Sequence, residues 1–534
     1  HHLVAEAHEL ASQRLAGDPR AEHTKFHRIS LRRIELPDCP VRPDLTLDGA
    51  SISPLLAPPR PVSSHPPSPV TANPFARVYA DLRDERRVGR YPPGPTSFSL
   101  PRTHRLSHDP LPLLLRWYEE YGPIFTVRVL HAPQVFMLGP AANHFVTVSH
   151  AEGFHWREGA FKDLVPLLGD ALLTTDGDHH DRARRIMMPA FHRARIEAMV
   201  EAMAEEAGAA LDTWREGMVL DVYDWSRRLA MRIAMRTLLG LDPDETGKGA
   251  EAAEQFERAL SFYGRDFALW LLRGPGSPWQ KMQTARRRLD AIVLAEIRRR
   301  RSNGGGSGQD VLSMLVAAED EDGSRLSDGE IRDQLTTLLF AGHDTSTSTI
   351  SFLMYELARH PDALARLREE GDRVLGGQGP TVAQLAGELP ELEMALDETL
   401  RLYPPAWIGP RRAMRDFEFE GHRVNAGAYV AYCSWASHRL PDVWEDPEAF
   451  VPERFTRERK ARLPKGAYVP FGGGSRICIG KRLGATLVKV VATMILQRAG
   501  LGLRPGYEMT IRQMPTLSPR GGQPMVVQGR AAPA

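Results

Sequence analysis

The chain has 534 residues and a nearly balanced charge, with 68 basic and 67 acidic side chains and a formal net charge of +1. This balance gives no argument for a nucleic-acid partner, and the length alone could accommodate more than one domain. The three cysteines, Cys39, Cys433 and Cys478, lie far apart and form no metal-type or redox-type pair. A disulfide framework is therefore not expected, and a reducing, cytoplasmic location is predicted.

The N-terminal region differs in composition from the rest of the chain. The first residues, HHLVAEAHEL, lack the apolar core of a signal peptide, and no apolar run reaches the roughly 18 residues of a membrane helix, so no transmembrane anchor is expected. Residues 1–75 are dense in Pro and Ser without a sustained period, which predicts a disordered or non-native extension. Residues 76–534 are predicted to form one domain.

The predicted elements begin with a stiff turn at YPPGP (91–95) and a helix over 111–122 that ends at Gly122. FTVRVL (125–130) and QVFMLG (134–139) alternate apolar and polar residues, which predicts two strands joined by a short turn. Beyond residue 140 the helical period dominates. Amphipathic helices are predicted near 179–216, 220–240, 250–272, 278–302, 327–360 and 381–403. The predicted fold class is mainly α with one small β lobe.

A polar cluster, AGHDTS at 341–346, lies inside the apolar helix predicted over 327–360. Gly342 in a helix interior costs about 1 kcal/mol relative to alanine, but it leaves room for a flat ligand and a small gas molecule. Thr345 can donate its hydroxyl to the carbonyl of Ala341, four residues back. Asp344 places a carboxylate among apolar residues, where an unpaired charge is costly. Taken alone, the pattern is more typical of a capping or packing cluster.

A glycine-rich stretch, FGGGSRICIG at 471–480, places Cys478 just before a predicted helix. Such a run is tolerated where the backbone turns tightly or where a flat ligand approaches it closely. Free N–H groups at a helix start favour a thiolate, which suits a one-cysteine axial bond to haem iron. A lone cysteine is more often a small buried apolar residue.

The whole stretch resembles the haem-binding loop of the cytochrome P450 monooxygenases. Phe471, Gly474, Arg476, Cys478 and Gly480 match the motif Phe-x-x-Gly-x-Arg-x-Cys-x-Gly residue for residue. AGHDTS looks like the oxygen-activating motif of the same family. The resemblance covers about residues 90–530 and implies a triangular helical domain that encloses haem b.

The resemblance assigns roles to the residues of these two motifs. Cys478 would be the proximal thiolate that binds the iron, with Phe471 packed beside the sulfur. Gly472 and Gly480 would also belong to the haem-binding loop. On the opposite side, Ala341 and Gly342 would adjoin the haem, and Asp344 and Thr345 would deliver protons to bound oxygen, since O–O cleavage needs two protons.

The haem propionates need cations or donors once they are buried. Arg476 pairs with one of them by resemblance. Arg411 matches a second propionate-binding arginine of the family by its spacing before Asp416 and Phe417. The adjacent Arg412 is an alternative for the same role. The family usually has Trp-x-x-x-Arg ahead of Pro-Ala-Phe, and in this chain His180 and Arg184 occupy those two positions, so His180 departs from the pattern.

Glu398 and Arg401 lie three residues apart on one predicted helical face, where a surface pair contributes only a few tenths of a kcal/mol. PERF follows at 452–455. The combination resembles the family's buried Glu-Arg-Arg triad, here Glu398, Arg401 and Arg454, with a structural role.

The resemblance implies a monomeric monooxygenase that inserts one atom of O₂ into a lipophilic molecule such as a fatty acid, terpenoid, steroid or polyketide. Two electrons would come from a separate ferredoxin or flavodoxin with its NAD(P)H reductase. Lys481, Arg482 and Lys489 could dock that partner or could be ordinary solvated charges. A haem-thiolate isomerase or dehydratase, and a non-catalytic haem sensor, are the alternatives. Asp344 and Thr345 argue against both, because neither alternative needs a proton relay.

Overall fold

The computed structural model describes residues 74–242, 247–265, 267–270, 272–304 and 308–529. These residues belong to one compact unit, Pro66–Ala534. The predicted N-terminal extension lies outside the described residues except for its last two positions, which open helix α3 (Pro74–Val88).

A five-stranded sheet with the order β1-β2-β8-β5-β3 forms the β lobe. β1 (Ile124–Val129) and β2 (Ala132–Met137) pair antiparallel, which confirms the predicted hairpin to within two residues at each end. β8 (Tyr429–Cys433) runs parallel to β2 and antiparallel to β5 (Ile408–Ala413). β3 (Phe154–His155) pairs with β5 at the far edge. The lobe therefore joins strands that lie almost 300 residues apart in sequence.

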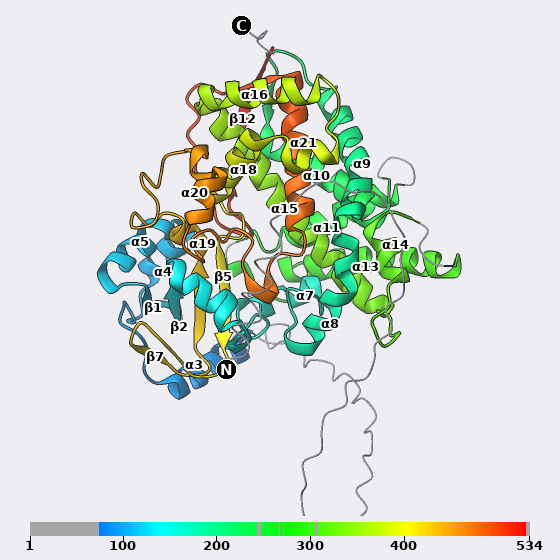
Figure 1. Cartoon of the computed structure of the whole chain (residues 1–534). Coiled ribbons are helices and arrows are strands. Elements are labelled where there is room, and N and C mark those ends of the chain that lie inside the picture. The colour runs from blue at the N-terminus through cyan, green and yellow to red at the C-terminus, as the bar shows by residue number, and fades with distance from the viewer. Residues whose placement is uncertain (1–73, 243–246, 266, 271, 305–307, 530–534) are drawn as a thin grey trace, which may run out of the picture. The chain divides into compact units, whose positions relative to one another are not determined.

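The helices α3, α4 (Leu100–His108) and α5 (Pro110–Tyr121) lie beside this sheet, on the left of Figure 1. α5 begins at a proline and ends before Gly122. Gly122 has a φ of 83°, a conformation that glycine adopts with little strain and that other residues rarely adopt. The predicted helix over 111–122 is therefore confirmed.

The larger part of the unit is helical (Figure 1). Its helices are α6 (Pro140–His144), α7 (Val165–Leu168), α8 (Gly177–Met187), α9 (Arg193–Leu211), α10 (Val222–Ala234), α11 (Lys248–Leu260), α12 (Phe267–Trp270), α13 (Pro278–Ser302), α14 (Val311–Ala317), α15 (Asp328–Arg359), α16 (Pro361–Leu375), α17 (Val382–Gly387), α18 (Pro390–Leu402), α19 (Ser434–Ser437), α20 (Arg457–Arg462) and α21 (Lys481–Arg498). The fold class, mainly α with a small β lobe, is as predicted.

Two predicted helices are interrupted by proline, which removes a backbone donor and clashes with the preceding turn. The segment predicted over 179–216 divides into α8 and α9 around Pro189, and the segment over 381–403 divides into α17 and α18 at Pro390. By contrast, α13 and α15 occupy the predicted ranges 278–302 and 327–360 almost unchanged.

α15 passes through the middle of the helical part and packs against α10, α13, α18 and α21 (Figure 1). Its start is fixed by a capping box, in which the Ser327 hydroxyl accepts the Glu330 N–H and the Glu330 carboxylate accepts the Ser327 N–H. Most of its side chains are buried, as expected of a helix that packs against other elements along most of its length. The AGHDTS cluster therefore lies in the middle of the central helix of the fold.

Short strands complete the structure and were not predicted from the sequence. They are β4 (Val219–Asp221), β6 (Phe417–Phe419), β7 (His422–Val424), β9 (Gly500–Leu503), β10 (Ile511–Arg512), β11 (Ser518–Pro519) and β12 (Pro524–Gln528). β12 lies between β4 and β9 and so ties the end of the chain to the start of α10.

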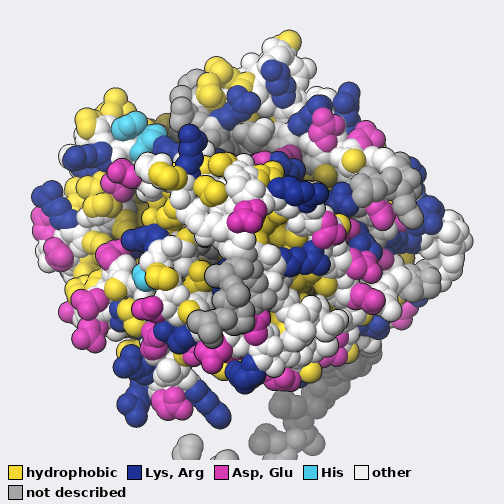
Figure 2. All heavy atoms as spheres, turned by 90° about the horizontal axis from the view of Figure 1, so that it is seen from above, with side chains coloured by type: hydrophobic (Ala, Val, Ile, Leu, Met, Phe, Trp, Pro, Cys, Tyr) yellow, Lys and Arg dark blue, Asp and Glu magenta, His cyan; other side chains and the backbone are white. Residues whose placement is uncertain are grey.

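On the face seen in Figure 2, basic and acidic side chains are intermingled around apolar areas, and neither sign forms a continuous surface there. This agrees with the near-zero net charge. Within the described ranges, every helix is too short or too polar to cross a lipid bilayer.

Candidate functional site

The loop that carries Cys478 is held by its own backbone and by two glycines with positive φ. The Cys478 N–H donates to the Phe471 carbonyl at 3.0 Å. Gly472 and Gly474 have φ values of 69° and 61°, and a Cβ on Gly474 would lie 2.2 Å from the Thr147 carbonyl oxygen. Only glycine fits there without a shift of the backbone. The tight turn predicted at the glycine run is confirmed.

The Cys478 side chain keeps an exposed face although protein atoms surround the loop, while the other described cysteine, Cys433, is fully buried in the core. Burial among the surrounding protein atoms raises the pKa of the Cys478 thiol, and this effect exceeds the opposing effects of the Gly480 amide, Arg184 and Lys481. The amides at the helix start lower this pKa, as expected, but their effect is smaller than that of burial. The loss of hydration outweighs the amide donors, and a bound metal would have to supply the remaining stabilisation.

The middle of α15 has one side that is not covered by protein. Ala341 and Thr345 are half-buried and Gly342 is exposed, whereas His343 and Asp344 between them are buried. A Cβ on Gly342 would have no protein atom within 4 Å outside its own turn of helix. The Thr345 hydroxyl donates to the Ala341 carbonyl at 2.6 Å, which confirms the predicted bond. This side of α15 thus combines open space with a single hydroxyl.

Asp344 points to the opposite side of α15 and is held by hydroxyl groups. Thr516 donates to one carboxylate oxygen at 2.5 Å, and Tyr223 of α10 donates to the other at 3.4 Å. Arg512 in turn donates to the Tyr223 hydroxyl at 3.1 Å. Burial and the nearby Asp344 charge raise the pKa of Tyr223 to about 12, so Tyr223 remains a donor. These three partners carried no signal in the sequence.

Arg476 projects from the cysteine loop toward the segment that precedes α8. It donates to the carbonyls of Leu172 (3.2 Å) and Thr175 (2.8 Å) and to the Asp176 carboxylate (2.5 Å). Asp176 also accepts the backbone N–H groups of Trp156 and Arg157 at 3.0 and 2.9 Å. Burial lowers the pKa of Arg476 to about 10, so it is still charged at neutral pH.

The structure distinguishes Arg411 from Arg412, which point to opposite sides of β5. Arg411 is buried against the Trp156 ring, 3.9 Å from its centroid, on the same side as Arg476. Arg412 instead donates to Asp84 of α3 at 2.8 Å. Of the two arginines, only Arg411 therefore joins the cluster around Arg476.

His180 and Arg184 of α8 complete this cluster. His180 is buried, and its pKa is lowered by burial and by the Arg476 charge. Its Nδ1 lies 2.8 Å from the Asp181 carboxylate. Arg184 is half-buried, lies close enough to Cys478 for the two charges to interact, and has no ion pair or side-chain hydrogen bond within the described residues. Four cationic or donor groups thus meet two carboxylates, Asp176 and Asp181.

If Arg411 binds a haem propionate, as the resemblance implies, Arg411→Ala should release haem at least about tenfold faster than the wild type, because a charge-assisted hydrogen bond contributes roughly 1.5–3 kcal/mol. Arg412→Ala should keep wild-type haem retention and lose only the ion pair with Asp84. Transfer of haem to an excess of an apoprotein acceptor measures both rates. Equal haem loss in the two variants would contradict the assignment of Arg411.

The three residues of the predicted triad are in contact. Glu398 and Arg401 are fully buried and joined by two hydrogen bonds of 2.7 and 2.8 Å. Arg454 donates to the same Glu398 carboxylate at 3.3 Å, and so does the backbone N–H of Val451 at 2.9 Å. Arg401 also donates to the carbonyls of His438, Pro447 and Ala449. The triad therefore fixes the segment 438–454, which leads to the cysteine loop.

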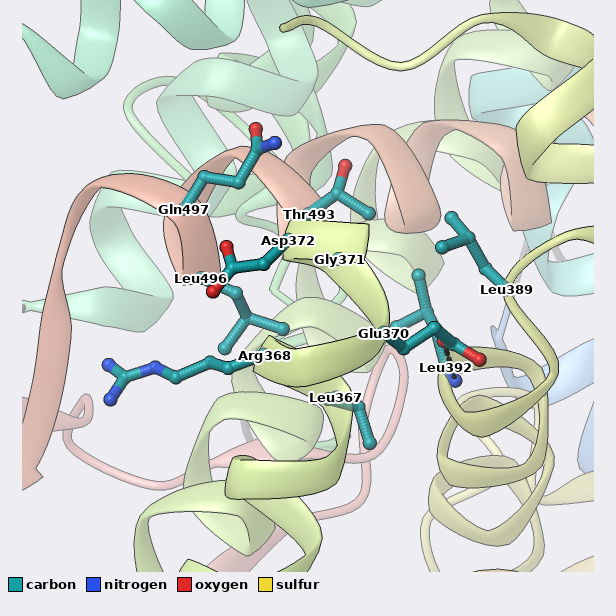
Figure 3. Close-up of a pocket in the computed structure, with 10 residues that line it drawn as sticks. All are labelled: Leu367, Arg368, Glu370, Gly371, Asp372, Leu389, Leu392, Thr493, Leu496 and Gln497. Atoms are coloured by element: carbon teal, nitrogen blue, oxygen red, sulfur yellow. Dashed lines mark hydrogen bonds between the residues drawn. The ribbon is translucent and has the colours of Figure 1, made fainter. Parts of the chain in front are cut away.

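The donor set around Cys478 fits a haem. No group of three or more His, Cys, Asp or Glu side chains that could hold a bare metal ion occurs in the described part of the chain. A single sulfur would suit an iron whose other ligands come mainly from a macrocycle. The arginines beside Cys478 carry more positive charge than the nearby aspartates neutralise, which suits the two propionate carboxylates of a haem. The pocket drawn in Figure 3 lies between α16 and α21. None of the residues that line it belongs to the site around Cys478, so it is a gap in the helix packing and not part of this site.

Comparisons with known proteins agree with this arrangement. The cytochrome P450 family model matches residues 90–517. Cyclooctat-9-en-7-ol 5-monooxygenase of Streptomyces melanosporofaciens is 37% identical over 358 residues, 65% of this chain and 76% of that protein. Cytochrome P450 139 of Mycobacterium tuberculosis is 32% identical over 402 residues, 73% and 90% of the two chains. The solved structure of retinoic acid-bound cyanobacterial CYP120A1 has a TM-score of 0.74 at 29% identity and covers 83% of this chain and 100% of that one.

The chain belongs to the cytochrome P450 family. It is a haem b enzyme and an oxidoreductase that incorporates oxygen from O₂, as its monooxygenase relatives are.

Proposed function

We propose that this enzyme hydroxylates or epoxidises a lipophilic, terpenoid-like molecule. The observation that carries the proposal is the exposed Cys478 on its glycine loop, with the arginine cluster beside it and the uncovered side of α15 in the same fold. The relatives support the substrate class. One acts on cyclooctat-9-en-7-ol, another is cyclooctatin synthase of Streptomyces melanosporofaciens, and CYP120A1 was solved with retinoic acid. Cyclooctat-9-en-7-ol and retinoic acid are both unsaturated, and each carries a single polar group.

Cys478 would hold the haem iron, with Phe471, Gly472 and Gly480 shaping the loop around the sulfur. Arg476, Arg411, His180 and Arg184 would bind the propionates. Ala341 and Gly342 would leave space beside the macrocycle on the α15 side. When bound, haem supplies the electron-transfer and oxygen chemistry. The protein contributes the thiolate, the fixed cations, and an enclosed site.

Proton supply falls to two neighbouring residues of α15. The Thr345 hydroxyl lies on the uncovered side, where it can hold a proton near the reacting oxygen. Asp344 lies on the buried side and can exchange protons through the hydroxyls of Tyr223 and Thr516. Side-chain groups of this kind typically contribute 10²–10⁴-fold to a proton-transfer step.

Electrons would come from a separate ferredoxin or flavodoxin with its NAD(P)H reductase. Lys481 and Arg482 are exposed at the start of α21 and can face such a partner. Lys489 cannot do so, because it is buried and donates to the Leu385 carbonyl and Glu393. Docking through Lys489 is therefore excluded.

The proposal is tested by turnover with a surrogate ferredoxin and reductase. Substrates are first selected from a lipophilic panel, half of it terpenoid, by the low-spin to high-spin shift of the ferric Soret band. Products formed under ¹⁸O₂ should carry one labelled oxygen atom. Conversion of only fatty acids or polyketides would overturn the terpenoid assignment. Turnover without uptake of label would overturn both hydroxylation and epoxidation.

Thr345→Ala should lower the product formed per NADPH by about tenfold or more and divert electrons to hydrogen peroxide, because the hydroxyl at the uncovered side is lost. Thr347→Ala is the matched control, since Thr347 makes the same kind of bond, to the His343 carbonyl at 2.8 Å, but is fully buried. NADPH consumption, peroxide and product are measured together. Unchanged coupling in Thr345→Ala would contradict proton delivery by this residue.

A further inference from the structure

A single histidine connects the buried triad to the cysteine loop. His438 directly follows α19 and is fully buried. The Val469 backbone N–H donates to its Nε2 at 2.9 Å, and its Nδ1 lies 3.2 Å from the Arg401 carbonyl oxygen. An amide N–H can only donate, so Nε2 is the acceptor and Nδ1 carries the proton that bonds to the carbonyl.

The ring is held in this neutral form by its surroundings. Burial, followed by the Arg401 charge, lowers the pKa of His438 to about 3. Arg401 also donates to the backbone carbonyl of His438 at 2.9 Å. Both the backbone and the ring of His438 are therefore bonded to Arg401, the arginine that Glu398 holds.

From His438 the bonds continue into the cysteine loop. The Val469 carbonyl accepts the Gly472 N–H at 3.1 Å, and the Phe471 carbonyl accepts the Cys478 N–H at 3.0 Å. Within the described residues, the imidazole of His438 is the side chain that bonds both to a triad residue and to this backbone path, whereas the neighbouring Tyr468 bonds to Asp397 of α18. A displacement of Val469 would pass to Gly472 and Phe471, and from there to the backbone of Cys478.

We propose that His438 is a positioning residue for Cys478, and that its Nε2 acceptor fixes the backbone at Val469 so that the sulfur stays bonded to iron. This proposal rests on the proposed role of Cys478 as the iron ligand. It differs from a purely structural role, because it predicts that the two ring nitrogens have unequal effects on the iron–sulfur bond.

Two substitutions test the roles of the two ring nitrogens separately. His438→Gln can place its amide oxygen near the position of Nε2 and keep an acceptor for the Val469 N–H. His438→Asn can place its amide N–H near Nδ1 and keep the bond to Arg401, but it leaves the Val469 N–H unpaired. The readout is the Soret spectrum of the ferrous CO complex at equal haem content. The measured quantity is the ratio of two populations in this spectrum. They are the form that has lost the thiolate ligand and the form with the red-shifted band, which keeps it.

We expect His438→Asn to raise this ratio by roughly tenfold or more, the factor that corresponds to one unpaired buried donor, and His438→Gln to stay within about threefold of the wild type. Trp444→Phe is the matched control. Trp444 is also buried, it packs on Arg401 and His438, and its indole N–H has no partner within the described residues. This control should lower stability without changing the ratio.

Equal ratios for His438→Asn and His438→Gln would overturn the proposal, whether both match the wild type or both are raised. A raised ratio in Trp444→Phe would also overturn it, because any loss of packing near the triad would then suffice. A wild-type enzyme without the red-shifted band would instead overturn the proposed ligand role of Cys478, and the positioning role with it.

Discussion

Cys478→Ser is expected to abolish the red-shifted Soret band of the ferrous CO complex and to lower product formation at least about a thousandfold, which corresponds to about 4 kcal/mol in transition-state free energy. The serine hydroxyl has a similar size but is a much poorer anionic ligand, so the electron donation that favours O–O cleavage is lost. The measurements are the CO difference spectrum and turnover of a substrate identified by its spin shift.

Cys433→Ser is the control for this change. Cys433 is fully buried at the end of β8, and burial raises the pKa of its thiol to about 12, so it stays a neutral core residue. A hydroxyl there would be buried but could accept the Ala436 N–H that Sγ accepts at 3.4 Å, so we expect a loss of at most roughly 1–3 kcal/mol of stability, while the CO spectrum is retained. A red-shifted band that survives in Cys478→Ser and disappears in Cys433→Ser would reverse the assignment of the iron ligand.

Glu398→Ala is expected to destabilise the fold by roughly 3–5 kcal/mol, the usual cost of removing one member of a buried charged group. It leaves Arg401 and Arg454 without their carboxylate and the Val451 N–H without an acceptor. Because the same segment leads to the cysteine loop, we also expect little haem-loaded protein. Urea denaturation monitored by circular dichroism, together with haem content after purification, measures both effects.

The matched control is Glu453→Ala, in the same PERF segment. Glu453 is 48% exposed and pairs with Arg366 at the surface, 2.6 Å away. Exposed ion pairs of this kind contribute about 0–1 kcal/mol, so stability and haem content should stay near wild type. Similar losses in the two variants would contradict a specific role of the buried triad, because truncation of an exposed glutamate in the same segment would then have the same effect.

Much of the site could be predicted because its motifs are local. The Thr345 bond to Ala341 spans four residues, and Glu398 and Arg401 are one helical turn apart, so helix geometry alone brings each pair together. The glycine loop was predictable for the same reason, since positive φ is a local requirement. The roles of these residues remain proposals that the experiments above test.

The partners that were missed come from distant parts of the chain. Asp176 bonds to Arg476 across 300 positions, and Thr516 bonds to Asp344 across 172. Neither residue has an unusual sequence setting, because a single acid or hydroxyl in a loop is ordinary. The choice between Arg411 and Arg412 also needed the structure, since the alternation of β5 separates them only once its pairing with β8 is known.

Missing strands were the main error in the fold. β5 and β8 lie in a region where arginines, prolines and glycines interrupt the apolar pattern, so no alternation was recognised. Their stability comes from pairing with β2 and with each other, which is a tertiary effect.

Gly342 bears on attempts to make this enzyme more robust. Alanine at this position should increase the free energy of unfolding, because the position lies inside a long helix and has room for a methyl group. The exchange should raise thermal tolerance by the roughly 0.5–1 kcal/mol that separates the two residues in helices. That methyl would stand in the space that the proposed function assigns to oxygen and substrate. Stabilising substitutions chosen by helix propensity should therefore avoid the middle of α15, because a more stable helix there should lower the rate of turnover.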